Sequence, residues 1–151
     1  MTYDLNRFHE AQSANYEGYA TALAEIKNGR KVGHWIWYIF PQLKELGRSS
    51  TAQYYGIDGI DEARTYFADP VLSARLVEIS QTFAALAENN PVKILGHTDA
   101  MKVKSCMTLF LSVDPNNKTF QTVIDKFYGG KLDGLTIDVL NKETNGLIGK
   151  K

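Results

Sequence analysis

The densest group of chemically versatile side chains lies in the segment HWIWYIFPQ, residues 34–42. His34 can take up or release a proton near neutral pH, and we take it as the candidate catalytic residue. Trp35 offers a flat stacking surface, and the amide of Gln42 can both donate and accept hydrogen bonds. These groups suit a nucleobase or a sugar. Trp and Tyr also fill protein cores efficiently, so a purely structural role for this aromatic run stays open. We expect Trp37, Tyr38 and Phe40 to lie in the core, with His34 and Trp35 where the segment reaches the surface.

A second group of polar side chains follows Asp99, in a segment with helical spacing of its apolar residues. Lys102 and Ser105 are three residues apart, so both can point to one side of a helix. A lysine beside a hydroxyl can contact a phosphate. The alternative is that Lys102 belongs to an ordinary solvated helix surface. Tyr54, in a compact segment at residues 52–57, completes the set of candidate ligand-binding side chains.

The leading hypothesis is a helical domain that binds a nucleotide or an ADP-ribose-like ligand. In it Trp35 stacks on the base or sugar, His34 and Gln42 form hydrogen bonds to it, and Lys102 with Ser105 meets a phosphate. Hydrolysis of an N-glycosidic bond is the reaction we expect first. The competing hypothesis is a non-enzymatic protein-interaction module, which predicts one continuous exposed apolar patch and no polar-lined cavity.

Several function classes lack their signatures in this sequence. It has no Walker loop, no GxGxxG motif, no HExxH, no paired CxxC and no GxSxG. One Cys and three separated His residues are too few for a Cys/His zinc site, so we expect no metal and no cofactor. The formal net charge of zero makes nucleic acid an unlikely partner. Cys106, within an apolar stretch, is expected to be a buried and unreactive thiol.

The elements that must position these residues are mainly α-helices. We expect a compact single-domain bundle of about six to eight helices with little or no sheet. Asp-Pro at 69–70 marks the start of the clearest amphipathic helix, in which apolar residues recur every three or four positions from Leu72 to Leu86. Further helices are expected after Asp4, over 16–26, over 34–40 before Pro41, after Asp58, after Asp99, before Gly129 and over 135–140.

The chain boundaries and location follow from composition. We expect one domain over 1–151, with residues 144–151 as a frayed tail. No apolar run approaches the roughly 20 residues that a bilayer span needs, so we expect no membrane contact. A single cysteine fits a reducing compartment, and the protein is expected to be cytoplasmic. The sequence leaves the oligomeric state unknown.

Four blocks of the sequence carry a family resemblance: DLNRFxxAQ at the start, GRKxxHWxWxxFPQ at 29–42, SxxAxxY at 49–55 and DxxKxxSxMTLF at 99–110. They resemble the domain of unknown function 1810 family, small bacterial proteins sometimes labelled calpastatin-like, over most of residues 4–140. The resemblance implies a compact helical fold and no particular activity. Cys106 departs from it, standing where a small hydroxyl residue is expected. A looser likeness links the chain to the YbiA-like, ADP-ribose-linked glycosidases.

Overall fold

The computed structural model describes residues 3–143, and over this range the chain forms ten α-helices and one short 3-10 helix. In chain order these are α1 (Asn6–Gln12), α2 (Tyr19–Lys27), α3 (Ile36–Ile39), the 3-10 helix η1 (Lys44–Leu46), α4 (Ser50–Tyr55), α5 (Gly59–Ala68), α6 (Pro70–Ala84), α7 (Pro91–Leu95), α8 (His97–Val113), α9 (Lys118–Tyr128) and α10 (Gly134–Glu143). Within residues 3–143 there is no strand, and an isolated bridge joins Leu43 to Ile57. The mainly helical fold is therefore confirmed. There are more helices than expected, because α4 and α7 are too short to give a full period in the sequence, whereas the short helix expected before Pro41 is present as α3. The expected tail at 144–151 lies outside the described residues.

Local signals set most of the helix ends. Asp69 begins α6, where its Oδ1 accepts hydrogen bonds from the backbone N–H groups of Val71 (2.9 Å) and Leu72 (3.0 Å). Gly129 ends α9 in the left-handed conformation, at φ 62°. Asp99 differs from expectation, because α8 already begins at His97 and the Asp99 carboxylate instead pairs with Lys31 at 2.8 Å.

The α5 start also differs from expectation, because Asp58 makes no side-chain cap. Two carboxylates from further along the chain take over that role. Glu62 Oε1 accepts from the Asp58 N–H at 2.6 Å, and Glu143 Oε1 accepts from the Ile60 N–H at 3.0 Å. The last turn of α10 is thereby attached to the first turn of α5.

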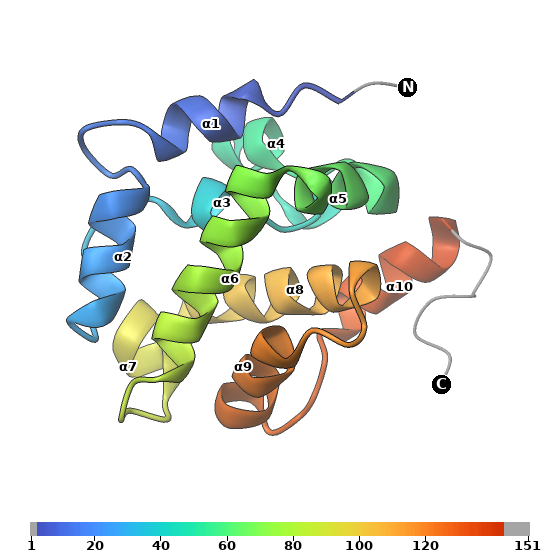
Figure 1. Ribbon diagram of the computed structural model, residues 1–151. Coiled ribbons are helices and arrows are strands. Elements are labelled where there is room, and N and C mark those ends of the chain that lie inside the picture. The colour runs from blue at the N-terminus through green and yellow to red at the C-terminus, as the bar shows by residue number, and fades with distance from the viewer. Residues whose placement is uncertain (1–2, 144–151) are drawn as a thin grey trace.

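The core is built around α8, which runs through the middle of the molecule with α6 crossing it and α9 beneath (Figure 1). Its Val103, Cys106 and Phe110 are fully buried. Helices α6 and α9 are joined by the stacked rings of Phe83 and Phe127, whose centroids are 4.1 Å apart. The short helix α3 lies between this centre and the layer formed by α1 and α4.

No helix between residues 3 and 143 combines the length and the apolar content that a membrane span requires.

Candidate functional site

The connector that leads into α3 is held by one carboxylate. Glu25 Oε1, on α2, accepts hydrogen bonds from the N–H groups of Val32 (2.7 Å) and Gly33 (2.9 Å) and from the indole Nε1 of Trp35 (2.8 Å). Lys31 lies beside it, with its ammonium 5.0 Å from the centroid of the Trp35 ring. The GRKxxHW block at residues 29–35 thus includes three donors whose hydrogen bonds to Glu25 fix the path of the chain.

Ionisation of Glu25 is favoured by these contacts. Burial opposes the charged form, but the hydrogen bonds from Gly33, Val32 and Trp35, with the Lys31 charge nearby, outweigh it. The pKa of Glu25 therefore lies below its usual value of 4.5. The carboxylate is charged at neutral pH and bonds its donors as an anion.

The positions of the two indoles, Trp35 and Trp37, are the reverse of those expected from the sequence. Trp35 is fully buried and its N–H is bonded to Glu25, so neither face is open to a ligand. Trp37 is partly exposed, and its buried Nε1 has no hydrogen-bond acceptor among the described residues. This corrects the expectation that Trp35 reaches the surface while Trp37 serves the core.

Trp37 lies beside two of the side chains singled out in the sequence. The Lys102 ammonium is 5.3 Å from the centroid of the Trp37 ring. Lys102, Gln42 and Trp37 line one small cavity of about 10 Å³, together with Ile36, Phe40, Ala52 and Gly56. The structure therefore brings Gln42 and Lys102 together around the second indole of the motif.

Ser105 is engaged elsewhere. It is buried, and its hydroxyl donates to the Met101 carbonyl (3.2 Å) and to Asp133 Oδ2 (3.1 Å). The same Asp133 oxygen accepts from the hydroxyl (2.6 Å) and the backbone N–H (3.1 Å) of Thr136, which fixes the start of α10. Although Ser105 is one helical turn from Lys102, it does not line the cavity at Trp37.

His34 lies at the surface. Its backbone N–H donates to Glu17 Oε2 at 2.6 Å, and the Glu17 carbonyl accepts from the Tyr38 hydroxyl at 2.6 Å. These two bonds hold Glu17 at φ 55°, a conformation that residues with a side chain rarely adopt. His34 lines neither the cavity at Trp37 nor the groove described next.

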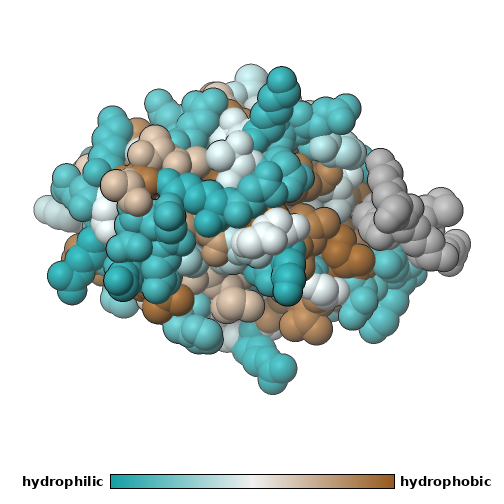
Figure 2. Space-filling model, turned by 90° about the horizontal axis from the view of Figure 1, so that it is seen from below, coloured by the Kyte–Doolittle hydropathy of each residue, from teal (hydrophilic) through white to brown (hydrophobic). Residues whose placement is uncertain are grey.

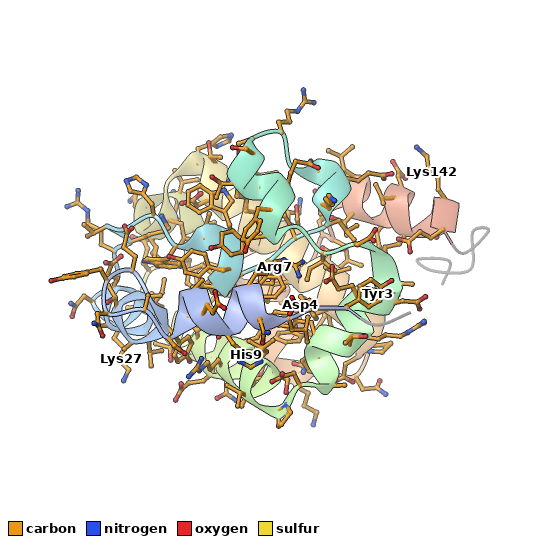
Figure 3. The ribbon with its side chains drawn as sticks, turned by 90° about the horizontal axis from the view of Figure 1, so that it is seen from above. Tyr3, Asp4, Arg7, His9, Lys27 and Lys142 are labelled. Carbon is orange, nitrogen blue, oxygen red and sulfur yellow. The ribbon has the colours of Figure 1, made fainter. Side chains whose placement is uncertain are left out.

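A larger groove opens on the side of the molecule where the N-terminal segment meets α10. It has two adjoining parts, of about 750 and 440 Å³, and both are lined by Tyr3, Lys44, Gln53 and Asp58. Figure 3 shows Tyr3, Asp4 and Arg7 along the N-terminal segment and α1, with Lys142 toward the same end of the molecule. Cavities of roughly 300–1,000 Å³ are typical of small-molecule sites. We call this feature the polar groove.

Tyr54 is the residue from the expected site that lines the polar groove. Tyr54 is 60% exposed, and its ring packs edge-to-face on Tyr55, with centroids 4.8 Å apart. Gln53, its neighbour on α4, holds the preceding loop by donating to the carbonyls of Lys44 (3.0 Å) and Gly47 (2.6 Å). The Tyr54 ring thus stands on a braced turn, with surface left free for contact.

Negative charge dominates the polar groove. Among the described lining residues, three are basic, whereas seven are carboxylates: Asp4, Glu10, Glu45, Asp58, Asp61, Glu62 and Glu143. The Arg7 guanidinium is already paired with the buried Glu62 at 3.1 Å. Desolvation, and then the Asp58 and Asp61 charges, raise the pKa of Tyr3 above its usual value. The groove is therefore better suited to positive charge or to hydroxyl groups than to phosphate.

No sequence motif marks this groove, because its residues come from distant positions in the chain. Tyr3, Lys44, Asp58 and Glu143 belong to four different segments, and no motif joins them. The carboxylates at 58–62 were visible as a cluster, but helix capping accounts for such a cluster equally well. Across the described part of the chain, no group of three or more His, Cys, Asp and Glu side chains could hold a metal ion.

Comparisons with known proteins agree with the fold. The family model for the protein of unknown function DUF1810 matches residues 2–140. The crystal structure of the conserved hypothetical protein Rv1873 from Mycobacterium tuberculosis is similar to this chain, with 37% sequence identity and a TM-score of 0.86. That similarity covers 91% of this chain and 96% of the other. No match is found among curated proteins.

Proposed function

Because this chain belongs to the DUF1810 family, whose function is unknown, we propose its function from its own geometry: it binds a small ligand of the nucleoside class in the polar groove. The observation that carries the proposal is a groove of about 750 Å³ with an adjoining part of about 440 Å³, both lined by polar side chains. Small-molecule sites are usually concave and combine apolar or aromatic surface with a few converging polar groups, and Leu43, Ile57 and Val139 supply apolar surface in the larger part of this groove.

The side chains that line the groove restrict the class of ligand that the sequence predicts. Tyr54 and Tyr3 offer aromatic surface on which a base can stack. Carboxylates accept hydrogen bonds from sugar hydroxyls. An excess of carboxylates repels a phosphate group, so a nucleoside fits this groove better than a nucleotide or ADP-ribose.

Hydrolysis of an N-glycosidic bond is the reaction that we propose for the groove. The transition state of glycoside cleavage carries positive charge on the sugar, which nearby carboxylates stabilise. Asp58 is the carboxylate that we propose for this role, because within residues 3–143 its side chain makes no hydrogen bond or ion pair and it faces both parts of the groove. Glu143 is partly used, since it caps α5.

A thermal-shift screen tests the proposal. We expect nucleosides to raise the unfolding temperature, because a ligand at about 100 times its Kd stabilises a protein by about 2.7 kcal/mol. Nucleotides and ADP-ribose are expected to act more weakly. Release of free base is then measured by chromatography, with Asp58→Asn as the inactive variant. Stabilisation by ADP-ribose alone, or by none of these compounds, would contradict the proposal.

The competing idea of a protein-interaction module finds less support in the surface. Among residues 3–143, the exposed large hydrophobic side chains come from separate parts of the fold: Tyr16, Val32, Tyr54, Val71, Val92, Met101, Leu132 and Leu135. The face shown in Figure 2 is predominantly hydrophilic, with hydrophobic residues visible in limited areas. The interaction-module hypothesis also predicted no polar-lined cavity, whereas the polar groove is lined by many polar side chains. The cytoplasmic location stays a prediction, as does any role for His34, which lies outside the polar groove.

A further inference from the structure

Ion pairs cancel part of the charge in the polar groove, and the remainder is negative. Glu62 is paired with Arg7 at 3.1 Å. Asp61 is paired with Arg64, outside the groove lining, at 3.2 Å. Among the described lining residues, five carboxylates then remain against two lysines: Asp4, Glu10, Glu45, Asp58 and Glu143 against Lys44 and Lys142. A hollow lined by one sign of charge attracts the opposite sign, so the groove favours a positively charged ligand over a neutral one.

The aromatic lining of the groove favours the same charge. A cation over the face of a tyrosine ring is attracted by the negative face of the ring. Tyr54 is 60% exposed, and its ring is held against Tyr55. Tyr3 lines both parts of the groove, and the nearby Asp58 and Asp61 charges help to raise its pKa, so its ring stays uncharged at neutral pH. A flat ligand with delocalised positive charge would therefore gain more here than a neutral one.

The chemistry of N-glycosidic cleavage leads to the same class of ligand. When the bond breaks, its electron pair stays on the base, so a neutral base leaves easily only if a general acid protonates it. Histidine is the side chain best suited to donate that proton near neutral pH. Among the described residues that line the groove there is no histidine, since His9, His34 and His97 all lie outside it. A base that is already positively charged needs no such proton.

We infer that the polar groove selects nucleosides whose base carries a positive charge at neutral pH, such as purines alkylated on a ring nitrogen. This inference rests on the proposed function and names its substrate class. The bond between the anomeric carbon and the base nitrogen breaks, and its electron pair makes the base neutral. Water then adds its oxygen to the sugar cation, and one proton passes to the Asp58 carboxylate and on to the solvent. The groove carboxylates stabilise positive charge first on the base and then on the sugar.

Two isomeric nucleosides give a direct test. 1-Methyladenosine is positively charged near neutral pH, whereas its isomer with the methyl group on the exocyclic amine is neutral. Calorimetry measures both dissociation constants in the wild type, Asp58→Asn and Asp138→Asn. Asp138→Asn is the matched control, because Asp138 is also exposed but does not line the groove. We expect the wild type and Asp138→Asn to bind the charged isomer about tenfold more tightly, and Asp58→Asn to prefer it only about threefold. Added salt should reduce the preference, because the groove is open to solvent.

The outcomes separate this inference from the proposed function. Chromatography should detect release of the free base from 1-methyladenosine faster than from its neutral isomer, with the release lost in Asp58→Asn. Equal affinities for the two isomers, or binding of neutral nucleosides alone, would overturn the inference and leave the proposed function standing. An equal loss of preference in Asp58→Asn and Asp138→Asn would also overturn it, because the charge effect would then lie outside the groove. Binding of no nucleoside, charged or neutral, would overturn both.

Discussion

Replacing Glu25 by Ala removes the acceptor that holds the connector before α3. Three donors lose it: the N–H groups of Val32 and Gly33 and the indole N–H of Trp35. Hydrogen bonds to charged groups contribute about 1.5–3 kcal/mol each, and an exposed one contributes least. The Val32 bond is exposed, whereas Trp35 is fully buried and its N–H would stay unsatisfied. We expect Glu25→Ala to lower the free energy of unfolding by about 3–5 kcal/mol.

The isosteric variant Glu25→Gln separates charge from shape. Its amide oxygen can still accept from the same donors, so we expect a loss of about 1–2 kcal/mol at neutral pH. Because the pKa of Glu25 lies below 4.5 in the folded protein, its contribution is complete above that value and is lost as pH falls further. The difference between the wild type and Glu25→Gln should therefore be constant near neutral pH and shrink below about pH 4.5.

Urea unfolding followed by tryptophan fluorescence measures these losses. Glu45→Ala is the control, because Glu45 is exposed and makes no hydrogen bond or ion pair among the described residues, and its change should stay within about 0.5 kcal/mol. A loss below about 1 kcal/mol for Glu25→Ala would refute the reasoning. So would a Glu25→Gln difference that grows as the solution becomes more acidic.

Three further predictions concern single positions. Asp69→Ala removes the cap of α6 and the ion pair with His9 (2.7 Å), and should cost about 1–2 kcal/mol in urea unfolding. Asp138→Ala is the control and should change the stability by less than about 0.5 kcal/mol, because Asp138 is exposed on α10 and its side chain makes no hydrogen bond or ion pair among the described residues. At Gly129 the added carbon of an alanine meets no neighbouring atom within 4 Å, but the residue would have to keep φ 62°. We therefore expect Gly129→Ala to lower the free energy of unfolding by about 1–2 kcal/mol. Gly134→Ala should lower it less, because the Gly134 backbone is not left-handed. Burial raises the pKa of the Cys106 thiol well above its usual value. A thiol reagent should therefore react with Cys106 only after denaturant is added. Fast reaction in the native state would contradict its burial.

The fold was predictable where a few neighbouring residues decide the local structure. Asp69 with Pro70 specifies the start of α6, and Gly129 specifies the end of α9, because each acts through its own turn. Asp99 shows the limit of such reasoning. Its position suits a helix cap, yet Lys31, far away in the sequence, takes its carboxylate into an ion pair.

The site was harder to predict because partners from other helices decide which side chains are free. Nothing within four residues distinguishes Trp35 from Trp37. Glu25, on α2, accepts the N–H of Trp35 and draws that ring into the core, which leaves Trp37 beside Lys102. Likewise Ser105 was expected to point with Lys102 toward a ligand, but Asp133 binds its hydroxyl.

The dissociation constant of a stabilising nucleoside, compared by calorimetry in Tyr54→Ala, Tyr16→Ala and His34→Ala, tests the central claim most directly. Stacking of one base on an aromatic ring contributes about 1–3 kcal/mol, so Tyr54→Ala should weaken binding about tenfold or more. Tyr16→Ala is the matched control, because Tyr16 is 89% exposed and lies outside the polar groove. Both Tyr16→Ala and His34→Ala should leave the dissociation constant unchanged. Loss of binding in His34→Ala with no change in Tyr54→Ala would contradict a ligand in the polar groove.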